Sequence, residues 1–390
     1  MGKNINVKNF KISILGQKRI PSREGGVEVV VEELATRIAK RGIDVTVYNR
    51  RGNHISGKEF NDDFMKAEEY EGVRIITVPT IEKKGLAAAS SSFFATIKSI
   101  FGSYDCIHYH AEGPCAMLWI PHMFGIRTVA TIHGLDWQRA KWGKFATWYL
   151  KFGEKIAAKY ADEVIVLSNN VQKYFKDTYN RDTVFIPNGV NKPEIKVANS
   201  ITNKWGLKKD NYILYLGRIV PEKGIEYLID AFKEINTSKK LVIAGGASDT
   251  DEFMSKLKKK AQYDNRIIFT GFVQGEVLEE LYSNAYIYAL PSDLEGMPLS
   301  LLEAMSYGNC CLVSDIHECT EVVEDKAVIF KKGDVEDLMK KIQYLCEEQC
   351  VVEEYKRVAA DYICDKYNWD DISEKTLSLY YGKNIQNIKR

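Results

Sequence analysis

Short apolar runs alternate with amphipathic stretches along the first half of the chain. Between the first two runs, residues 27–40 carry apolar side chains at helical spacing, and Gly42 suits the end of a helix. Strands that alternate with helices are typical of a parallel α/β sheet. The strands predicted from the apolar runs are Lys11–Gly16, Ile43–Tyr48, Val73–Val78, Cys106–Tyr109, Thr128–Ile132 and Glu163–Leu167.

The alternation starts again after the turn-forming residues 187–189, with a helix expected near residues 225–235. This pattern predicts two doubly wound, Rossmann-like domains, residues 1–188 and 189–368, which face a central cleft. A helical segment, residues 369–390, follows. Ligands of such sheets bind at the C-terminal ends of the strands. The strands predicted in the second half are Tyr212–Gly217, Leu241–Ala244, Ile267–Phe269, Ala285–Leu290 and Asn309–Val313.

Composition and charge narrow the class of protein. With 45% apolar and 27% charged residues among 390, the composition is typical of a soluble globular protein. No apolar run of about 18 residues predicts a membrane span. Residues 1–10 are polar and include Lys3 and Lys8, so no secretion signal is expected and the protein is predicted to be cytoplasmic. The net charge is +7 for residues 1–190 and −6 for residues 191–390, so the basic half is suited to an anionic surface or acceptor.

The cysteines and histidines do not predict a metal site. The eight cysteines form no C-x2-C pair and most lie in apolar runs, so buried reduced thiols are expected. His108 and His110 are expected on one face of a strand, as structural or cleft-lining residues. The D-x-D sequence at residues 249–251 is interpreted as a solvated loop or a helix cap.

The most informative motif places two glutamates, Glu295 and Glu303, eight residues apart after an apolar run. Pro298 suits the first helical position and Gly308 suits the C-terminal cap. This places Glu295 just before a helix N-terminus and Glu303 about two turns inside the helix. The N–H groups of a helix N-terminus can bind a diphosphate, and a carboxylate can accept hydrogen bonds from sugar hydroxyls.

The strand, the Gly-Met-Pro turn and the two glutamates together resemble the E-x7-E signature of retaining glycosyltransferases with the GT-B fold, the group 1 or family 4-like enzymes. The resemblance covers nearly the whole chain. It implies that residues 1–188 form the acceptor-side domain, that residues 189–368 form the nucleotide-sugar-binding domain, and that the C-terminal helix, residues 369–390, crosses back onto the N-terminal domain. It implies transfer of a hexosyl unit from a nucleoside-diphosphate sugar to an alcohol, with no metal or other cofactor. The residues that the resemblance assigns to the donor in this segment are Glu295, Gly296, Met297, Pro298, Leu299 and, for the ribose, Glu303.

Two cations follow the first predicted strand of the second domain. Arg218 can bind a diphosphate in bidentate fashion and Lys223 can act as a point charge. The family has an Arg and a Lys at this position, which implies that they offset the charge of the leaving nucleoside diphosphate. Phe272 and Val273 follow another strand, and the resemblance implies that they are the candidates for contact with the nucleobase.

The first domain supplies two further candidates. Gly25 and Gly26 lie between the first strand and the first helix, where they can let backbone N–H groups approach an anion. A tight turn with Gly at positive φ is the alternative interpretation. His133 follows a strand, and the resemblance implies that it contacts the donor sugar; a structural histidine is the alternative. The absence of a G-x-G-x-x-G sequence disfavours a nicotinamide cofactor.

Basic and aromatic residues are interleaved after His133. Residues 139–159 hold six basic residues and one acidic residue. The apolar spacing predicts that Phe145, Tyr149, Phe152 and Ile156 form a buried face. The other Trp and Lys residues are predicted to meet the acceptor or an anionic membrane, with a solvated helix face as the alternative. The residues assigned to this acceptor or membrane side are Trp137, Arg139, Lys141 and Trp142.

The motifs together predict a retaining glycosyltransferase whose catalytic residues are Glu295, His133, Arg218 and Lys223. Residues 134–142 resemble those of bacterial polysaccharide glycosyltransferases. The predicted acceptor is therefore a lipid-diphosphate-linked glycan in capsule or other surface polysaccharide synthesis, and nucleic acid is not an expected partner. The alternatives are a GT-B sugar-nucleotide epimerase or hydrolase, and a non-catalytic partner subunit of a glycosyltransferase.

Overall fold

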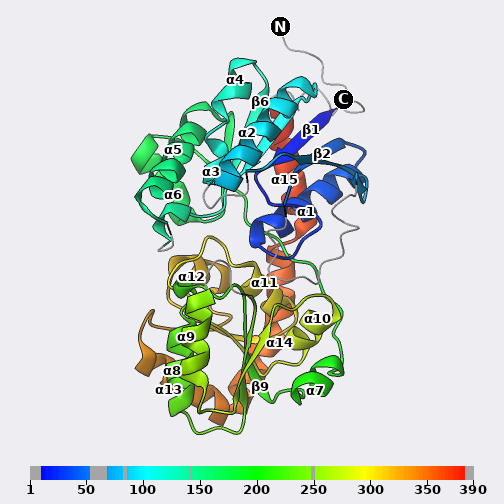
Figure 1. Ribbon diagram of the computed structural model, residues 1–390. Helices are drawn as coiled ribbons and strands as arrows, with labels where there is room; N and C mark the ends of the chain where they lie inside the picture. Colours follow the sequence, from blue (N-terminus) through cyan, green and yellow to red (C-terminus); the bar gives the residue numbers. More distant parts are fainter. Residues whose placement is uncertain (1–9, 53–67, 82–85, 140–141, 247–250, 383–390) are drawn as a thin grey trace. The chain divides into compact units, whose positions relative to one another are not determined.

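The computed structural model describes residues 10–52, 68–81, 86–139, 142–246 and 251–382 (Figure 1). The chain divides into two compact units. The first unit comprises Met1–Asn188 and Trp369–Arg390, and the second comprises Gly189–Asn368.

The first unit is built on an eight-stranded sheet of order β3-β4-β2-β1-β5-β6-β7-β8. All neighbouring strands are parallel except β3 and β4. Parallel neighbours require crossover connections, which here are mostly helical. The strands are β1 (Lys11–Leu15), β2 (Asp44–Arg50), β3 (Glu69–Tyr70), β4 (Val73–Val78), β5 (Cys106–His110), β6 (Arg127–Ile132), β7 (Glu163–Val166) and β8 (Val184–Phe185).

The last helix of the chain completes the first unit. Tyr380 is fully buried there, and the Arg127 Nε donates a 2.8 Å hydrogen bond to the carbonyl of Leu379. At the other end of this helix, the Arg37 Nε lies 3.1 Å from the Asp370 carboxylate. The helices of this unit are α1 (Gly26–Lys40), α2 (Leu86–Phe101), α3 (Glu112–Cys115), α4 (Trp119–Met123), η3 (Asp136–Gln138), α5 (Lys144–Tyr160), α6 (Asn169–Tyr179) and α15 (Trp369–Tyr381).

The second unit contains a six-stranded parallel sheet of order β11-β10-β9-β12-β13-β14. The central strand β9 is apolar throughout, as expected for a strand covered on both faces, and Ile213 and Leu214 are fully buried. The strands are β9 (Tyr212–Leu216), β10 (Lys240–Ala244), β11 (Ile267–Gly271), β12 (Ile287–Leu290), β13 (Cys310–Ser314) and β14 (Val328–Phe330).

Helix α8 illustrates why the second unit folds as the apolar pattern predicts. Its residues Ile225, Leu228, Ile229 and Phe232 are all fully buried, and they follow the i, i+3, i+4, i+7 spacing of one helix face. The helices of this unit are α7 (Ser200–Trp205), η4 (Pro221–Lys223), α8 (Ile225–Glu234), α9 (Asp251–Ala261), α10 (Glu276–Ser283), α11 (Leu299–Ser306), α12 (His317–Val323), α13 (Val335–Glu347) and α14 (Gln349–Lys366).

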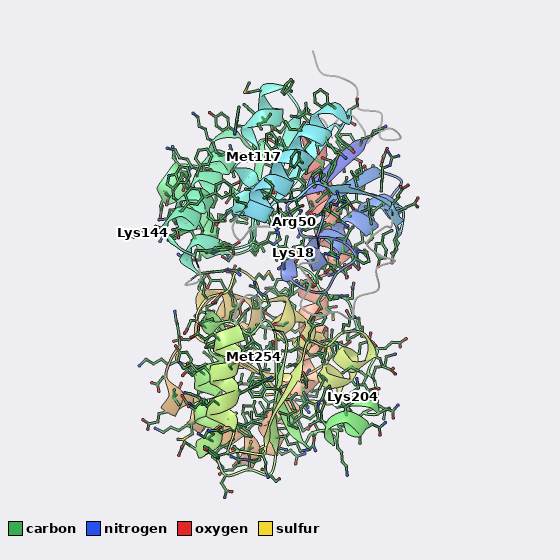
Figure 2. The ribbon with its side chains drawn as sticks, viewed as in Figure 1. Lys18, Arg50, Met117, Lys144, Lys204 and Met254 are labelled. Atoms are coloured by element: carbon green, nitrogen blue, oxygen red, sulfur yellow. The ribbon has the colours of Figure 1, made fainter. Side chains whose placement is uncertain are left out.

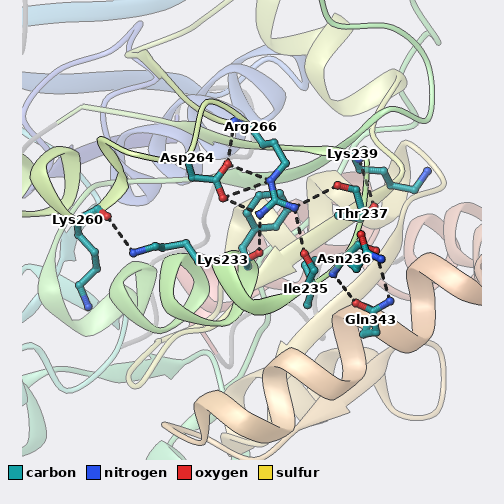
Figure 3. A network of polar contacts seen from close by, with 10 residues as sticks. Lys233, Ile235, Asn236, Thr237, Lys239, Lys260, Asp264, Arg266 and Gln343 are labelled. Atoms are coloured by element: carbon teal, nitrogen blue, oxygen red, sulfur yellow. Dashed lines mark hydrogen bonds and ion pairs between the residues drawn. The ribbon is translucent and has the colours of Figure 1, made fainter.

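A polar network holds the N-terminal edge of this second sheet (Figure 3). The guanidinium of Arg266, just before β11, donates to the carbonyls of Ile235 and Thr237 at 3.1 Å each. The same group pairs with Asp264 at 2.6 Å and lies over the ring of Phe232. These contacts tie the segment after α8 to the start of β11, at the end of the sheet opposite to the loops that follow β9 and β12.

Most predicted elements are confirmed, with two corrections. The short strands β3, β8 and β14 were not predicted, since two or three residues carry too little pattern. The predicted buried face of α5 is wrong for two of its four residues: Phe145 is 72% exposed and Phe152 is 38% exposed, whereas Tyr149 and Ile156 are partly buried. The residues that α5 buries are Leu150, Gly153, Glu154, Ala157 and Ala158.

The eight cysteines are free thiols, and five of them are buried. This confirms the prediction of reduced thiols; Cys350 is exposed. None of the described helices has both the length and the apolar character needed to cross a membrane.

Candidate functional site

Two neighbouring strands of the second unit carry the predicted donor residues. Strands β9 and β12 pair in parallel, so the loops after them leave the same edge of the sheet. Arg218 and Lys223 lie on the loop after β9, and Glu295 lies on the loop after β12. The structure therefore brings the predicted cations and the first glutamate of the motif to one edge.

A glycine allows the two loops to touch. Gly224 has φ +64°, and a Cβ at this position would lie 1.8 Å from the carbonyl oxygen of Pro291. The backbone N–H of Asp293 also donates to the carbonyl of Glu222 at 2.8 Å. Only glycine permits both this backbone conformation and this close approach.

The Lys223 side chain is paired with Glu295. Its Nζ lies 2.5 Å from the Glu295 Oε1, and the two side chains are only 13% and 7% exposed. The hydroxyl of Ser292 donates to the same oxygen at 2.6 Å, and the hydroxyl of Ser314 donates to the Ser292 carbonyl at 2.5 Å. Two donors, Lys223 and Ser292, thus fix the Glu295 carboxylate. Neither Ser292 nor Ser314 was predicted as a site residue from the sequence, because isolated serines form no recognisable motif.

The second glutamate of the motif is oriented by a tyrosine. The hydroxyl of Tyr282 donates to the Glu303 Oε2 at 3.0 Å, and the Tyr282 ring stacks on Tyr307 with centroids 5.2 Å apart. Burial, followed by the charge of Glu303, holds the pKa of Tyr282 well above its ordinary value, so this hydroxyl remains a donor. Tyr282 comes from α10, which is distant in sequence, and the motif alone could not predict it.

The helix of the motif begins one residue later than predicted. Pro298 is the N-cap of α11, not its first residue, and Gly308, with φ +74°, follows the C-cap Tyr307. Glu303 is therefore the fifth helical residue, about one turn inside the helix rather than two. Gly296, Met297 and Leu299 lie around this N-terminus, where Met297 is buried and the other two are partly buried.

The remaining donor candidates of the second unit lie at the same sheet edge. The carbonyl of Arg218 accepts a 2.9 Å hydrogen bond from the Tyr215 hydroxyl, which fixes the start of the cationic loop. Phe272 and Val273 are partly buried and follow β11, the edge strand two places from β9. Their contact with a base remains a prediction.

Gly25 and Gly26 of the first unit do not form the tight turn that was considered. Gly25 is the N-cap of α1 with an extended backbone, φ −155°, and Gly26 opens the helix. A Cβ at Gly25 would lie 2.3 Å from the Glu28 carboxylate, which itself accepts from the N–H of Lys18 at 2.8 Å. This glycine therefore leaves room for a carboxylate of the protein.

Two basic residues, Lys18 and Arg50, lie at the loop between β1 and α1 (Figure 2). The N–H of Arg50 donates to the Lys18 carbonyl at 2.7 Å, so the end of β2 lies beside the loop after β1. The Arg50 guanidinium donates to the Gly16 carbonyl at 2.9 Å. Neither Lys18 nor Arg50 was singled out from the sequence.

His133 belongs to a cluster of histidines. Its Nε2 lies 2.9 Å from the Nδ1 of His110, and the His110 and His108 rings are 4.1 Å apart. The adjacent rings confirm that His108 and His110 share a strand face. Burial holds the pKa of His133 at about 4, so its ring is neutral at neutral pH.

One of the residues assigned to the acceptor side, Trp137, contacts a buried glutamate. Trp137 donates from its Nε1 to the fully buried Glu154 at 3.1 Å, and its ring lies 4.0 Å beneath the Lys151 ammonium. Arg139 pairs with Asp136 at 2.8 Å. Trp142 is partly buried. Lys141 lies outside the described residues, as do Asp249 and Thr250 of the D-x-D sequence.

An exposed aromatic row runs along the other face of α5. Phe145, Trp148 and Phe152 are 72%, 58% and 38% exposed, and each successive pair of ring centroids is 5.8 Å apart.

Among the described residues, no group of three or more His, Cys, Asp or Glu side chains is arranged to hold a metal ion.

Comparison with known proteins identifies the family. Residues 198–363 match the family described as Glycosyl transferases group 1, and residues 24–192 match Glycosyltransferase Family 4. The chain is 24% identical to an uncharacterized glycosyltransferase of Methanocaldococcus jannaschii, over 95% of this chain and 98% of the relative. It is 28% identical to the UDP-Gal:alpha-D-GlcNAc-diphosphoundecaprenol alpha-1,3-galactosyltransferase of Escherichia coli, over 63% and 67% of the two chains.

A solved structure agrees with this assignment. The Anabaena protein HepE in complex with UDP and glucose superimposes with a TM-score of 0.78 at 18% identity, over 95% of this chain and 98% of that one. At this identity the likeness concerns the fold. The two family matches together span most of both units, and the chain is a glycosyltransferase of the group 1 type with the GT-B fold.

Proposed function

We propose that this glycosyltransferase is a retaining, metal-independent hexosyltransferase that uses a nucleoside-diphosphate sugar as donor. The observation that carries the proposal is the Lys223–Glu295 pair at the C-terminal edge of the second sheet, with Ser292 as the second donor to the carboxylate. A carboxylate fixed by two donors keeps one orientation, which suits the binding of a sugar hydroxyl beside a diphosphate.

The other site residues of the second unit bind different parts of the donor. Arg218 and Lys223 offset the charge that develops on the leaving diphosphate, together with the N-terminus of α11. Glu303, oriented by Tyr282, accepts hydrogen bonds from the ribose hydroxyls. The acceptor hydroxyl attacks from the face that the diphosphate leaves, with the leaving phosphate as base.

Residues of the first unit complete the proposed chemistry. His133 contacts the transferred sugar, as the family resemblance implies. The E. coli relative acts, by its name, on a sugar that is linked to diphosphoundecaprenol. A lipid-diphosphate-linked glycan in capsule or other surface polysaccharide synthesis is therefore the acceptor that we propose.

The first unit also suggests how such an acceptor is reached. The aromatic row Phe145, Trp148 and Phe152 is flanked on α5 by Lys144 (Figure 2), Lys151 and Lys155. Helices that carry basic and aromatic residues together bind to anionic membrane interfaces. We propose a peripheral contact of α5 with the cytoplasmic membrane surface.

The test begins with nucleotide binding. Calorimetric titration with UDP, GDP, dTDP and ADP in the presence of EDTA identifies the base and shows whether a metal is required. Binding of one nucleotide in EDTA supports the donor site, and UDP is the first choice because HepE was solved with UDP. Binding only after a divalent cation is added would refute metal independence.

The second step tests the reaction. The sugar of the bound nucleotide is supplied with a lipid-diphosphate-linked glycan, and proton NMR of the product reports the anomeric configuration. An α-linked product from an α-linked donor confirms retention, and a β-linked product refutes it. Release of free or epimerised sugar without an acceptor would favour a hydrolase or epimerase. Absence of nucleotide binding would favour a non-catalytic partner subunit.

A further inference from the structure

Three histidines and a tyrosine form a buried cluster in the first unit. His108 and His110 point to one face of β5, and His133 follows β6, the neighbouring strand. Tyr380 reaches the cluster from α15. His108 and His110 are fully buried, whereas His133 is partly exposed. His133 is thus the member of the cluster that a ligand can reach.

The hydrogen bonds of the cluster connect its members in two pairs. The Nδ1 of His108 lies 2.6 Å from the Tyr380 hydroxyl, and its Nε2 lies 2.7 Å from the Thr131 hydroxyl. The Nδ1 of His110 lies 2.9 Å from the Nε2 of His133, with the two ring centroids 5.2 Å apart. His133 therefore has one ring nitrogen held by the protein.

The rings are neutral at neutral pH. Burial lowers the pKa of His108 to about 3 and the pKa of His110 well below its ordinary value. The pKa of His133 is lowered to about 4, mainly by burial, while Asp136 acts to raise it and Arg139 acts to lower it. A neutral imidazole carries one N–H and one bare nitrogen, so a single proton lies between His110 and His133.

The surroundings of His110 indicate which ring holds that proton. Its Nε2 is buried and has no hydrogen-bond partner among the described residues. A buried N–H without an acceptor is rarer in proteins than a buried acceptor without a donor. The proton of His110 therefore lies on Nδ1 and is donated to the Nε2 of His133. His133 must then carry its own proton on Nδ1.

We infer that His110 is a positioning residue that holds His133 as the Nδ1–H tautomer, so that His133 offers a single hydrogen-bond donor to the transferred sugar. The inference rests on the proposed function for its ligand, since a ring N–H suits the oxygen of a sugar hydroxyl. The tautomer itself depends only on the geometry of the first unit. A hydrogen bond from a neighbouring residue to one ring nitrogen commonly fixes the tautomer and the ring orientation of a histidine that binds a ligand through the other nitrogen.

The experiment compares two substitutions of His110. His110→Asn places an amide N–H close to the position of Nδ1, and His110→Leu removes the donor at similar volume. Nitrogen-15 NMR of histidine-labelled protein reports which ring nitrogen of His133 is protonated. We expect protonated Nδ1 and bare Nε2 in the wild-type protein and in His110→Asn, and a mixture of tautomers in His110→Leu.

Kinetics with the donor sugar supply the second readout. Loss of orientation in His110→Leu is expected to lower kcat/KM about 10-fold to 100-fold, and His110→Asn is expected to restore it to within about threefold of the wild type. Tyr380→Phe is the control, because it breaks a buried hydrogen bond of the same cluster without touching the His110–His133 pair. It should lower thermal stability and leave the His133 tautomer unchanged.

The outcomes are distinct. Protonated Nε2 on His133 in the wild-type protein would overturn the inference, and so would a tautomer that is unaffected by His110→Leu. If the protein transferred no sugar, the proposed function would fail while the NMR result still decided the tautomer. If kcat/KM fell equally in His110→Asn and His110→Leu, His110 would have a structural role only, and the inference that it positions His133 would be wrong.

Discussion

At the residue scale, the Lys223–Glu295 pair determines how the donor site can be tested. Glu295→Ala would leave a largely buried ammonium without its partner, which costs about 3–5 kcal/mol of stability and would confuse misfolding with lost chemistry. Glu295→Gln keeps an oxygen for Lys223 and Ser292 and removes only the charge. We expect this variant to stay folded and to lose about 100-fold or more in kcat/KM. Sugar transfer measured below its melting temperature checks this, and activity within threefold of the wild type would remove Glu295 from the mechanism.

A second residue-scale prediction concerns Tyr282. Tyr282→Phe removes the hydrogen bond that orients Glu303, and a hydrogen bond to a charged group contributes about 1.5–3 kcal/mol. We therefore expect nucleotide affinity to fall about 10-fold or more in calorimetric titration. Tyr212→Phe is the matched control. It removes a buried hydrogen bond from the hydroxyl of Tyr212, at the start of β9, to the carbonyl of Leu281. If both variants bound nucleotide equally, Glu303 would not depend on Tyr282.

The third residue-scale prediction uses the buried carboxyl of Glu112. Burial, followed by the charges of Asp136 and Glu154, raises the pKa of this fully buried side chain far above its ordinary range. The folded protein therefore keeps a proton that the unfolded chain releases, so the stability associated with this group falls as pH rises above the ordinary carboxyl pKa.

Glu112→Gln carries no titrating proton and keeps nearly the same side-chain volume. We expect the variant to be more stable than the wild type near pH 8, with a difference that grows by at most about 1.4 kcal/mol for each pH unit. Urea unfolding at pH 6, 7 and 8 measures this difference. The exposed Glu354→Gln is the control. A difference that did not grow with pH would show that Glu112 is ionised in the folded protein.

At the scale of elements, the sequence predicted strands better than it predicted the faces of helices. Apolar runs such as Tyr212–Gly217 contain a strand, here β9, because parallel strands that are buried on both faces need apolar residues on both. The face of α5 was predicted only in part, because its buried side includes Glu154 and Gly153, which no apolar pattern marks. Their partners, Tyr174, Tyr179 and the backbone of α3, lie far away in sequence. Periodicity cannot detect a carboxylate that is buried by such distant hydrogen-bond donors.

The packing of α5 gives an element-scale prediction. A Cβ at Gly153 would lie 2.0 Å from the carbonyl oxygen of Glu112, so Gly153→Ala must push α5 away from α3. Overpacking of this kind costs about 1–3 kcal/mol, which urea unfolding can measure. Gly143→Ala at the N-cap of the same helix is the control, because nothing lies within 4 Å of its added Cβ. Equal stability of the two variants would show that α5 can move without cost.

At the scale of the whole molecule, the sequence predicted the GT-B fold because two kinds of signal agreed. The restart of the strand–helix alternation after residues 187–189 indicated a second domain, and the motif around Glu295 indicated the family. The motif could not predict the residues that support Ser292, Glu303 and His133. These supporting residues are Ser314, Tyr282 and His110, and they belong to other elements of the chain. These contacts exist only once each sheet has formed.

Charge is also distributed unevenly over the whole molecule, with +7 in residues 1–190 and −6 in residues 191–390. The exposed aromatic row of α5 lies in the basic part. An anionic membrane surface would attract the first unit and repel much of the second, and each lysine near such a surface contributes about 1 kcal/mol. Membrane binding should therefore require anionic lipid and weaken as salt is raised.

The membrane prediction is tested by sedimentation with phosphatidylcholine vesicles, with and without phosphatidylglycerol. The double variant Phe145→Ser, Trp148→Ser should reduce binding to the anionic vesicles at least about fivefold, because burying even one such side chain contributes about 1.5–3 kcal/mol. Tyr263→Ser is the matched control, since this side chain is 91% exposed but lies in the second unit. If the double variant bound as well as the control, α5 would not be the contact. If the wild-type protein did not bind anionic vesicles at all, the acceptor would have to reach the enzyme without help from the membrane surface.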